Sequence, residues 1–144
     1  LDALKVQANG GKGQQEGRWV SCPRLLTARK LHGVCSKNNK IYIFGGTTAG
    51  SFKPLTSAEM YDEATMKWSR IRDLPRPAQC CATTVCDEVY VILWGNPKNT
   101  GILHYSTKND KYTKMSKLPI SNWFGFAATS FGGFGFSAKG GGVA

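Results

Sequence analysis

The chain has 144 residues, of which 41% are hydrophobic and 19% are charged, an ordinary globular composition that suits one small domain and does not require disorder throughout. No apolar run approaches the roughly 18 residues of a membrane-spanning helix, and the sequence shows no signal-peptide pattern, so we expect no membrane partner. The net charge of +10 would attract acidic partners by long-range steering.

The positive charge is concentrated in the two flanks of the sequence. Residues 1–40 carry eight basic and two acidic side chains, residues 98–117 carry five lysines and one aspartate, and residues 41–97 are nearly neutral. Such flanks could attract nucleic acid. The lysines follow no RNA-binding aromatic motif, however, so a solvated basic rim is favoured over nucleic-acid binding.

The sequence contains an odd number of cysteines, five, which disfavours an extracellular disulfide framework. We expect reduced thiols and a cytoplasmic location, with the nucleus as the alternative. Cys80 and Cys81 would point to opposite faces of a strand, and no histidine lies within that segment. We therefore predict buried core residues there and no metal site.

Residues 1–28 are expected to hold two short strands around a loop. Residues 1–6 are apolar enough for a strand, and Trp19 lies in a second one. Residues 8–17 are rich in glycine and glutamine without periodicity, which indicates a flexible loop.

Residues 41–44 (IYIF) are β-branched and aromatic, which predicts a buried strand. Residues 37–40 form the turn that precedes it. Gly45 and Gly46 end the strand, and such a pair indicates positive φ angles or a close neighbouring chain.

A second turn follows within the same segment. Asp62 can accept hydrogen bonds from the backbone amides just ahead of it, which predicts a hairpin closed by Tyr61 and Trp68. A shift of 44 positions then superposes similar residues: Tyr61 on Tyr105, Trp68 on Tyr112, and Leu74-Pro75 on Leu118-Pro119. The sequence therefore predicts a repeated β unit, with the strand 89–94 and the turn residues Asp87 and Glu88 in the second copy.

A strand ending in Gly-Gly, a variable loop, a Tyr-Asp turn, a tryptophan seven residues after the tyrosine, and Leu-Pro together resemble one kelch repeat. The resemblance implies an all-β fold, a fragment of a kelch β-propeller made of four-stranded antiparallel blades, two complete and two partial. It divides the chain into the end of a preceding blade (1–28), a kelch repeat (29–76), a degenerate repeat (77–119), and the start of a further blade with a glycine-rich tail (120–144).

The sequence offers no constellation for catalysis, so we predict no catalytic, cofactor-binding or metal-binding residue. It lacks a nucleophile elbow and a phosphate-binding loop. His32 and His104 lie in different repeats and are predicted to be structural residues with satisfied hydrogen bonds.

The resemblance implies instead that partners bind to loops joining the second strand to the third, and one blade to the next. The candidate residues on these loops are Arg24, Arg29, Lys30, Phe52, Lys53, Arg76, Gln79, Asn96, Lys98, Asn122 and Trp123. Arg29 and Arg76 are the strongest candidates, because a guanidinium can hold a carboxylate through two hydrogen bonds. Phe52 and Trp123 could act as aromatic anchors.

By this resemblance the chain is a protein-protein interaction module that binds a protein or an acidic peptide. Kelch repeats commonly accompany a BTB domain in substrate-recognition adaptors of cullin-type ubiquitin ligases, and this role is the first expectation. One alternative is an actin-binding or scaffold kelch protein. Another is a catalytic propeller that resembles galactose oxidase and carries copper.

Overall fold

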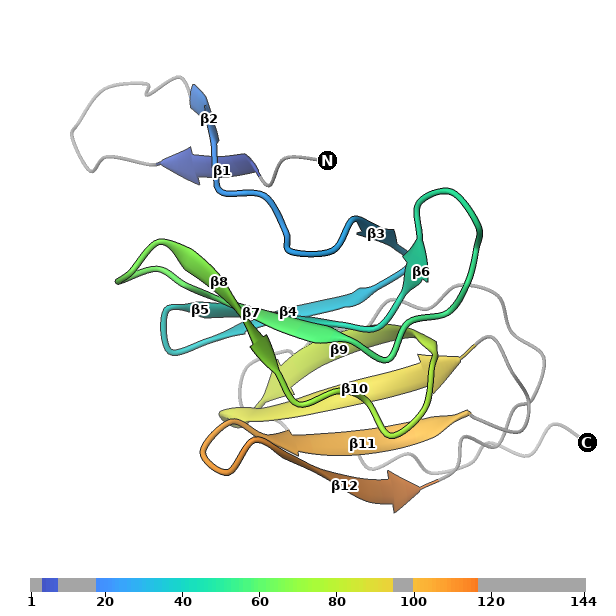
Figure 1. Ribbon diagram of the computed structural model, residues 1–144. Helices are drawn as coiled ribbons and strands as arrows, with labels where there is room; N and C mark the ends of the chain where they lie inside the picture. Colours follow the sequence, from blue (N-terminus) through green and yellow to red (C-terminus); the bar gives the residue numbers. More distant parts are fainter. Residues whose placement is uncertain (1–3, 8–17, 95–99, 117–144) are drawn as a thin grey trace, which may run out of the picture.

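The computed structural model describes residues 4–7, 18–94 and 100–116 (Figure 1). Every regular element in these ranges is a β-strand, which confirms the predicted all-β class. Within the same ranges, no helix is present that could cross a membrane.

The first large sheet is antiparallel and has the strand order β4-β5-β7-β8, comprising β4 (Gly33–Lys37), β5 (Lys40–Phe44), β7 (Ala58–Asp62) and β8 (Lys67–Ile71). Asn38 and Asn39 join β4 to β5 with φ angles of 50° and 56°. Two successive positive φ angles are typical of the tight turn that suits twisted antiparallel strands, and asparagine tolerates them well. The predicted turn at residues 37–40 is thus confirmed.

The second large sheet is also antiparallel, with the order β12-β11-β10-β9, comprising β9 (Gln79–Val85), β10 (Glu88–Trp94), β11 (Gly101–Ser106) and β12 (Lys111–Ser116). The predicted strand 89–94 lies within β10. Its turn is one residue earlier than expected, because Cys86 and Asp87 take the positive φ angles and Glu88 already pairs with Val85.

The two sheets repeat one pattern. Tyr61 pairs with Trp68 across β7 and β8, and Tyr105 pairs with Tyr112 across β11 and β12. The ring centroids of these two pairs lie 5.2 and 4.9 Å apart. Both four-stranded antiparallel sheets thus carry an aromatic pair at equivalent positions, in agreement with the blades that the sequence predicted.

The hydrophobic core lies between the two sheets. Phe44 and Tyr105 are almost fully buried, and their ring centroids are 5.3 Å apart in an edge-to-face arrangement. Val89 and Val91, which share one face of β10, join the same cluster. Alternate residues of β10 and β11 are buried, so one face of the second sheet packs against the first.

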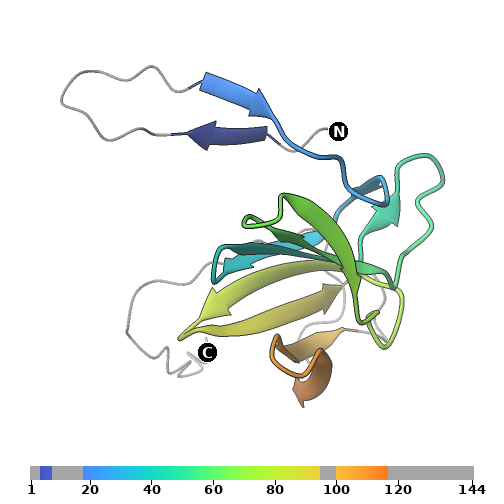
Figure 2. The same ribbon diagram turned by 60° about the vertical axis from the view of Figure 1, so that its left-hand side comes forward.

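Two smaller sheets complete the described fold. β1 (Leu4–Gln7) pairs with β2 (Arg18–Ser21), and β3 (Arg29–Lys30) pairs with β6 (Thr47–Thr48). Figures 1 and 2 both show the β1-β2 hairpin on the far side of the first sheet from the second sheet. The predicted further blade and tail, residues 120–144, lie outside the described residues, as does the predicted loop 8–17.

Candidate partner-binding surface

The β5-β7 loop, residues 45–57, begins with the glycine pair. Gly45 and Gly46 have φ angles of 54° and 91°. A Cβ atom on Gly45 would lie 2.5 Å from the carbonyl oxygen of Ala78, and the amide of Gly46 donates to that same oxygen at 2.9 Å. Both expectations for the pair are confirmed, and the glycines allow the loop to pack tightly against the β8-β9 connection, residues 72–78.

Arg29 is buried and its guanidinium is engaged within the fold, so the prediction that it holds a partner's carboxylate is wrong. Its side chain has no exposed surface. Nη1 donates to the carbonyl oxygens of Gly45 and Ser57, each at 2.7 Å, and Nη2 donates to Glu59 Oε1 at 2.5 Å. The bidentate capacity that suggested partner binding instead fixes both ends of the β5-β7 loop.

Glu59 is a structural residue that the sequence analysis missed. Its side chain is fully buried, and its second oxygen, Oε2, accepts a hydrogen bond from the amide of Leu26 at 2.8 Å. Glu59 therefore joins the segment before β3 to the first sheet. The sequence carried a signal, since Glu59 is two residues from Tyr61 and so shares its buried face of the strand, where a carboxylate requires a partner.

Phe52 lies at the tip of the same loop and 65% of its surface is exposed. The Lys30 ammonium lies 3.4 Å from the centre of the Phe52 ring, a cation-π contact between β3 and the loop. The loop is closed beneath the ring, because the amide of Thr48 donates to the carbonyl oxygen of Lys53 at 3.1 Å. The exposed ring is thus held by the fold.

The other predicted residues are distributed as follows. Arg24, Lys53 and Arg76 are exposed, and Gln79 is half-buried at the start of β9. Asn96, Lys98, Asn122 and Trp123 lie outside the described residues. The structure thus brings Lys30 and Phe52 into contact, and Arg76 lies in the connection against which the glycine pair packs.

These segments gather at one end of the first sheet. β5 ends and β7 begins there, and β8 ends there as well, since Phe44 pairs with Ala58 and Ala58 pairs with Ile71. We call this end the loop face, and define it as Lys30 with residues 47–56 and 72–78. The turns that carry Asn38 and Met66 lie at the opposite end of the sheet.

The two histidines differ from each other in their hydrogen bonding. His104 Nε2 lies 2.6 Å from Glu88 Oε2, which confirms its predicted satisfied role. His32 Nδ1 is buried without a hydrogen-bond partner in the described structure, so the same prediction is wrong for this atom. Burial, followed by the nearby Arg29 guanidinium, lowers the pKa of His32, which favours the neutral ring.

The cysteines are all free thiols. Cys80 and Cys81 are both buried, and the Cys80 thiol donates to the carbonyl oxygen of Phe44 at 2.7 Å. Burial raises the pKa of Cys80 to about 12. In the described ranges no three histidine, cysteine, aspartate or glutamate side chains cluster as metal ligands would.

A known protein family matches part of the chain. The Kelch motif family matches residues 28–75, the span that contains the first sheet, the glycine pair and the β5-β7 loop. Residues 28–75 therefore match a kelch motif, in agreement with the first of the predicted repeats.

Several characterised proteins are similar to the chain. Human Kelch repeat and BTB domain-containing protein 13 is 29% identical over 104 residues, which are 71% of this chain and 22% of that protein. Mouse Kelch-like protein 41 is 37% identical over 57 residues, 40% of this chain and 9% of that protein. Beta-scruin of Limulus polyphemus is 26% identical over 122 residues, 78% of this chain and 13% of that protein. The chain thus spans less than a quarter of the length of each.

Proposed function

We propose that the chain is a protein-binding module without catalytic activity, and that it binds its partner at the loop face. The observation that carries the proposal is Phe52, a large aromatic side chain that is 65% exposed although its loop is closed by internal hydrogen bonds. An exposed aromatic residue on a preformed loop is a typical anchor for a protein partner.

The chemistry around Phe52 favours an acidic peptide or an acidic protein surface. Lys30 contacts the ring, Lys53 follows it in sequence, and Arg76 is exposed in the β8-β9 connection of the same face. Positive charge beside an apolar anchor suits a peptide in which carboxylates flank an apolar side chain. The net charge of +10 would accelerate encounter with such a partner.

The proposed biological role is substrate recognition in a cullin-type ubiquitin ligase adaptor of the cytoplasm. The similarity to a protein named for its kelch repeats and BTB domain supports a BTB companion as part of this proposal. Relatives named as F-box/kelch-repeat proteins of Arabidopsis thaliana extend the pattern of kelch repeats joined to another domain. The similarity to beta-scruin supports the alternative, an actin-binding or scaffold role.

Partner capture tests the loop face directly. The chain and its Phe52→Ala and Lys30→Ala variants would be immobilised, and proteins retained from a cell extract would be quantified by mass spectrometry. We expect Phe52→Ala to weaken binding by roughly thirtyfold, the effect of losing an anchor worth about 2 kcal/mol.

Met66→Ala is the matched control for this experiment. Met66 is 60% exposed and has a φ of 55°, close to the 52° of Phe52, but it lies at the opposite end of the sheet. Its loss is expected to leave retention unchanged. Equal retention by all variants would contradict the loop-face assignment.

Two further measurements separate the alternatives. Cosedimentation with filamentous actin that disappears in Phe52→Ala would favour the actin-binding role over the adaptor role. Copper bound stoichiometrically by the purified protein would contradict the non-catalytic proposal and favour an oxidase-like propeller.

A further inference from the structure

The tip of the β5-β7 loop, residues 49–54, is exposed at every position. Figures 1 and 2 both show the chain between β6 and β7 projecting from the first sheet. Ser51 lies within this tip, and a Cβ atom added to the preceding Gly50 would meet nothing within 4 Å. The Ser51 hydroxyl is therefore accessible to the active site of another protein.

The contacts that close the tip are separate from those that fix the loop base. At the tip, the amide of Thr48 donates to the carbonyl oxygen of Lys53 at 3.1 Å, and the hydroxyl oxygens of Thr48 and Ser51 lie 2.6 Å apart. At the base, the amide of Leu55 donates to the carbonyl oxygen of Gly46 at 2.9 Å. The tip can therefore open into an extended segment, as an enzyme cleft requires, while the base remains folded.

The charge around Ser51 is positive. Lys30 Nζ lies 3.4 Å from the ring centre of Phe52, the next residue, and Lys53 follows two positions after Ser51. The whole loop face has four basic side chains and one acidic side chain, a surplus of three. A phosphate on Ser51 would therefore have two ammonium groups and the Thr48 hydroxyl nearby as donors.

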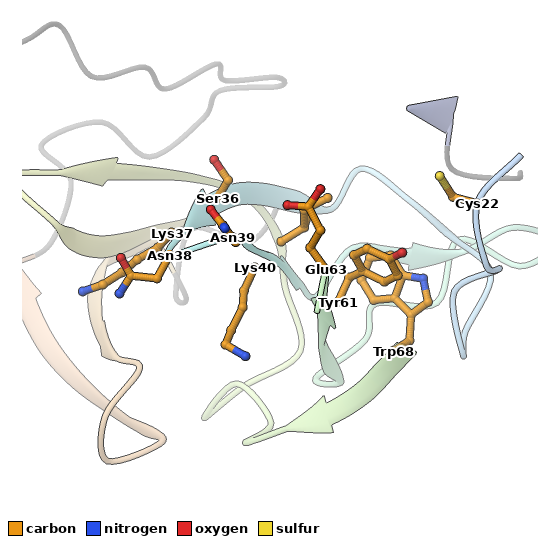
Figure 3. A pocket seen from close by; sticks show the side chains of 10 residues that line it. Cys22, Ser36, Lys37, Asn38, Asn39, Lys40, Tyr61, Glu63 and Trp68 are labelled. Carbon is orange, nitrogen blue, oxygen red and sulfur yellow. The ribbon is translucent and has the colours of Figure 1, made fainter. Parts of the chain in front are cut away.

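The opposite end of the first sheet differs in this respect. A pocket of about 420 Å³ lies there (Figure 3). Its lining residues come from separate segments of the chain and include Cys22, Asn38, Ile41, Tyr61 and Trp68. The lysines that also line the pocket are already paired with carboxylates, Lys37 with Asp87 and Lys40 with Asp62. Lys30 contacts an aromatic ring instead, so the loop tip is the better place to hold an added phosphate.

We propose that Ser51 is a phosphorylation site whose phosphate is held by Lys30, Lys53 and the Thr48 hydroxyl. The donor is a nucleoside triphosphate bound to a partner kinase. Ser51 Oγ attacks the γ-phosphorus, the bond from this phosphorus to the β-γ bridging oxygen breaks, and the nucleoside diphosphate leaves. The hydroxyl proton passes to a carboxylate base of the kinase. The lysines near Ser51 suit a kinase with an acidic substrate groove.

The consequence for recognition rests on the proposed function of the loop face. A phosphoserine carries a charge of about −1.5 to −2 at pH 7, which would remove most of the positive surplus of this face. The phosphate would also compete with a partner's carboxylates for Lys30 and Lys53. Phosphorylation of Ser51 is therefore expected to release an acidic partner.

Phosphate transfer is measured on the full chain in a cell extract supplied with magnesium and ATP labelled at the γ-phosphate. We expect Ser51→Ala to lose most of the label. Ser69→Ala is the matched control, because Ser69 is also exposed and lies near Lys67 and Arg70, but it is within β8 and pairs with Met60. It is expected to retain the label. No incorporation, or incorporation that does not depend on Ser51, would overturn the proposal.

The contacts of the phosphate are tested without a kinase or a partner. The full chain is produced with phosphoserine at position 51, and the second pKa of the phosphate is measured by phosphorus NMR. A phosphorylated peptide of residues 47–56, which keeps Lys53 and lacks Lys30, is the reference. We expect a pKa about 0.5 lower in the full chain, because a nearby ammonium group favours the dianion.

Variants of the phosphorylated chain locate this effect. Lys30→Met is expected to remove the difference from the peptide, whereas Lys67→Met, at the opposite end of the sheet, is expected to retain it. Circular dichroism verifies folding. Lys53→Met, at an exposed position, is expected to raise the pKa and is the second test if Lys30→Met is unfolded. Equal pKa values in chain and peptide would contradict the proposed contacts.

Partner capture separates this inference from the proposed function. The phosphorylated and unmodified chains are immobilised, and the proteins whose retention requires Phe52 are quantified. We expect the phosphorylated chain to retain about tenfold less of them. Equal retention would overturn the regulatory role and leave the loop-face assignment in place. If no protein requires Phe52, the proposed function fails, whereas the label and NMR measurements still decide whether Ser51 is the phosphorylation site.

Discussion

At the scale of single residues, the most consequential group is the buried pair of Arg29 and Glu59. Taking two charges out of water is costly, and the fold offsets this cost with hydrogen bonds from the guanidinium to Gly45 and Ser57. The pair joins the segment before β3, the ends of the β5-β7 loop and strand β7. Its role is to hold the loop face in place from beneath.

Removing one member of this pair is expected to destabilise the protein strongly. Arg29→Met would leave Glu59 as an uncompensated buried carboxylate, at a cost of about 3–5 kcal/mol in the free energy of unfolding. Urea denaturation followed by circular dichroism measures it. Lys53→Met, at an exposed position, is the control and is expected to change stability by less than about 0.5 kcal/mol. Equal midpoints for the two variants would refute the structural role of Arg29.

The glycine pair permits a second test at this scale. Gly45→Ala would require a positive φ, which costs about 1 kcal/mol or more, and would place Cβ 2.5 Å from a backbone oxygen. We expect a loss of at least about 2 kcal/mol in thermal or urea unfolding. Gly50→Ala in the same loop meets nothing within 4 Å and is expected to be neutral. A neutral Gly45→Ala would show that the loop can shift away from Ala78.

At the scale of strands and connections, each large sheet fastens the chain that enters it. Trp68 Nε1 donates to the carbonyl oxygen of Pro23, and the Tyr112 hydroxyl donates to that of Arg72 at 2.8 Å. Asp110 adds to the second junction by accepting from the amide of Arg72 at 2.8 Å. Trp68 and Tyr112, which occupy equivalent positions in the two sheets, thus each donate to a backbone carbonyl of the preceding connection. Such a bond does not depend on which side chains that connection carries.

Tyr112→Phe tests this fastening because it removes only the hydroxyl group. We expect a loss of about 0.5–1.5 kcal/mol in the free energy of unfolding, the usual worth of one hydrogen bond. Hydrogen exchange is expected to increase around Arg72 more than within β10. Tyr90→Phe, on the other face of the same sheet, is the comparison. Equal exchange near Arg72 in the two variants would argue against a role in anchoring the connection.

The sequence predicted features that depend on local chemistry or on repetition. The glycine pair and the Asp62 turn reflect backbone constraints that act within a few residues. The offset of 44 reflects similar residues that recur in the second sheet. It placed Arg29 on the surface because a loop arginine is usually exposed. Arg29 is buried because it pairs with Glu59, which lies thirty residues later in the sequence. No local sequence pattern indicates a contact between residues so far apart.

The pocket could not be predicted for a similar reason. Cys22, Ile41 and Trp68 line it from three separate segments, and their meeting depends on how the preceding connection crosses β7 and β8. The contact between Lys30 and Phe52 likewise depends on the pairing of β3 with β6. Both residues were predicted as separate candidates, but their contact was found only in the structure.

At the scale of the whole molecule, the two sheets share a core that contains titratable groups. Burial raises the pKa of Cys35 to about 11 and of Cys80 to about 12, from an ordinary value of 9.0. Burial also raises the pKa values of Tyr42, Tyr105 and Tyr112. All of these groups remain protonated in the folded protein under conditions where the unfolded chain would begin to release its protons.

The protein is therefore expected to lose stability in alkali. A group whose pKa is raised in the folded protein contributes its full stabilisation below the pKa that it has in the unfolded chain, about 9 for a cysteine. This contribution to stability falls as the pH rises toward about 12, the raised pKa of Cys80. The urea midpoint is expected to be lower at about pH 10.5 than at about pH 8. The fall is expected to be smaller in Cys80→Ala, which removes one such group. A midpoint that is constant or rises over this range would contradict the buried positions of these side chains.

In the proposed partner binding, the fixed support beneath the loop face would also affect the kinetics of association. Because Arg29 and Glu59 clamp the loop base, and Thr48 and Lys53 close its tip, a ligand would meet Phe52 in its final geometry. Little conformational entropy would then be lost on docking, and capture would proceed at a speed governed by diffusion and by ionic strength. Competing ligands would differ chiefly in how long they stay bound.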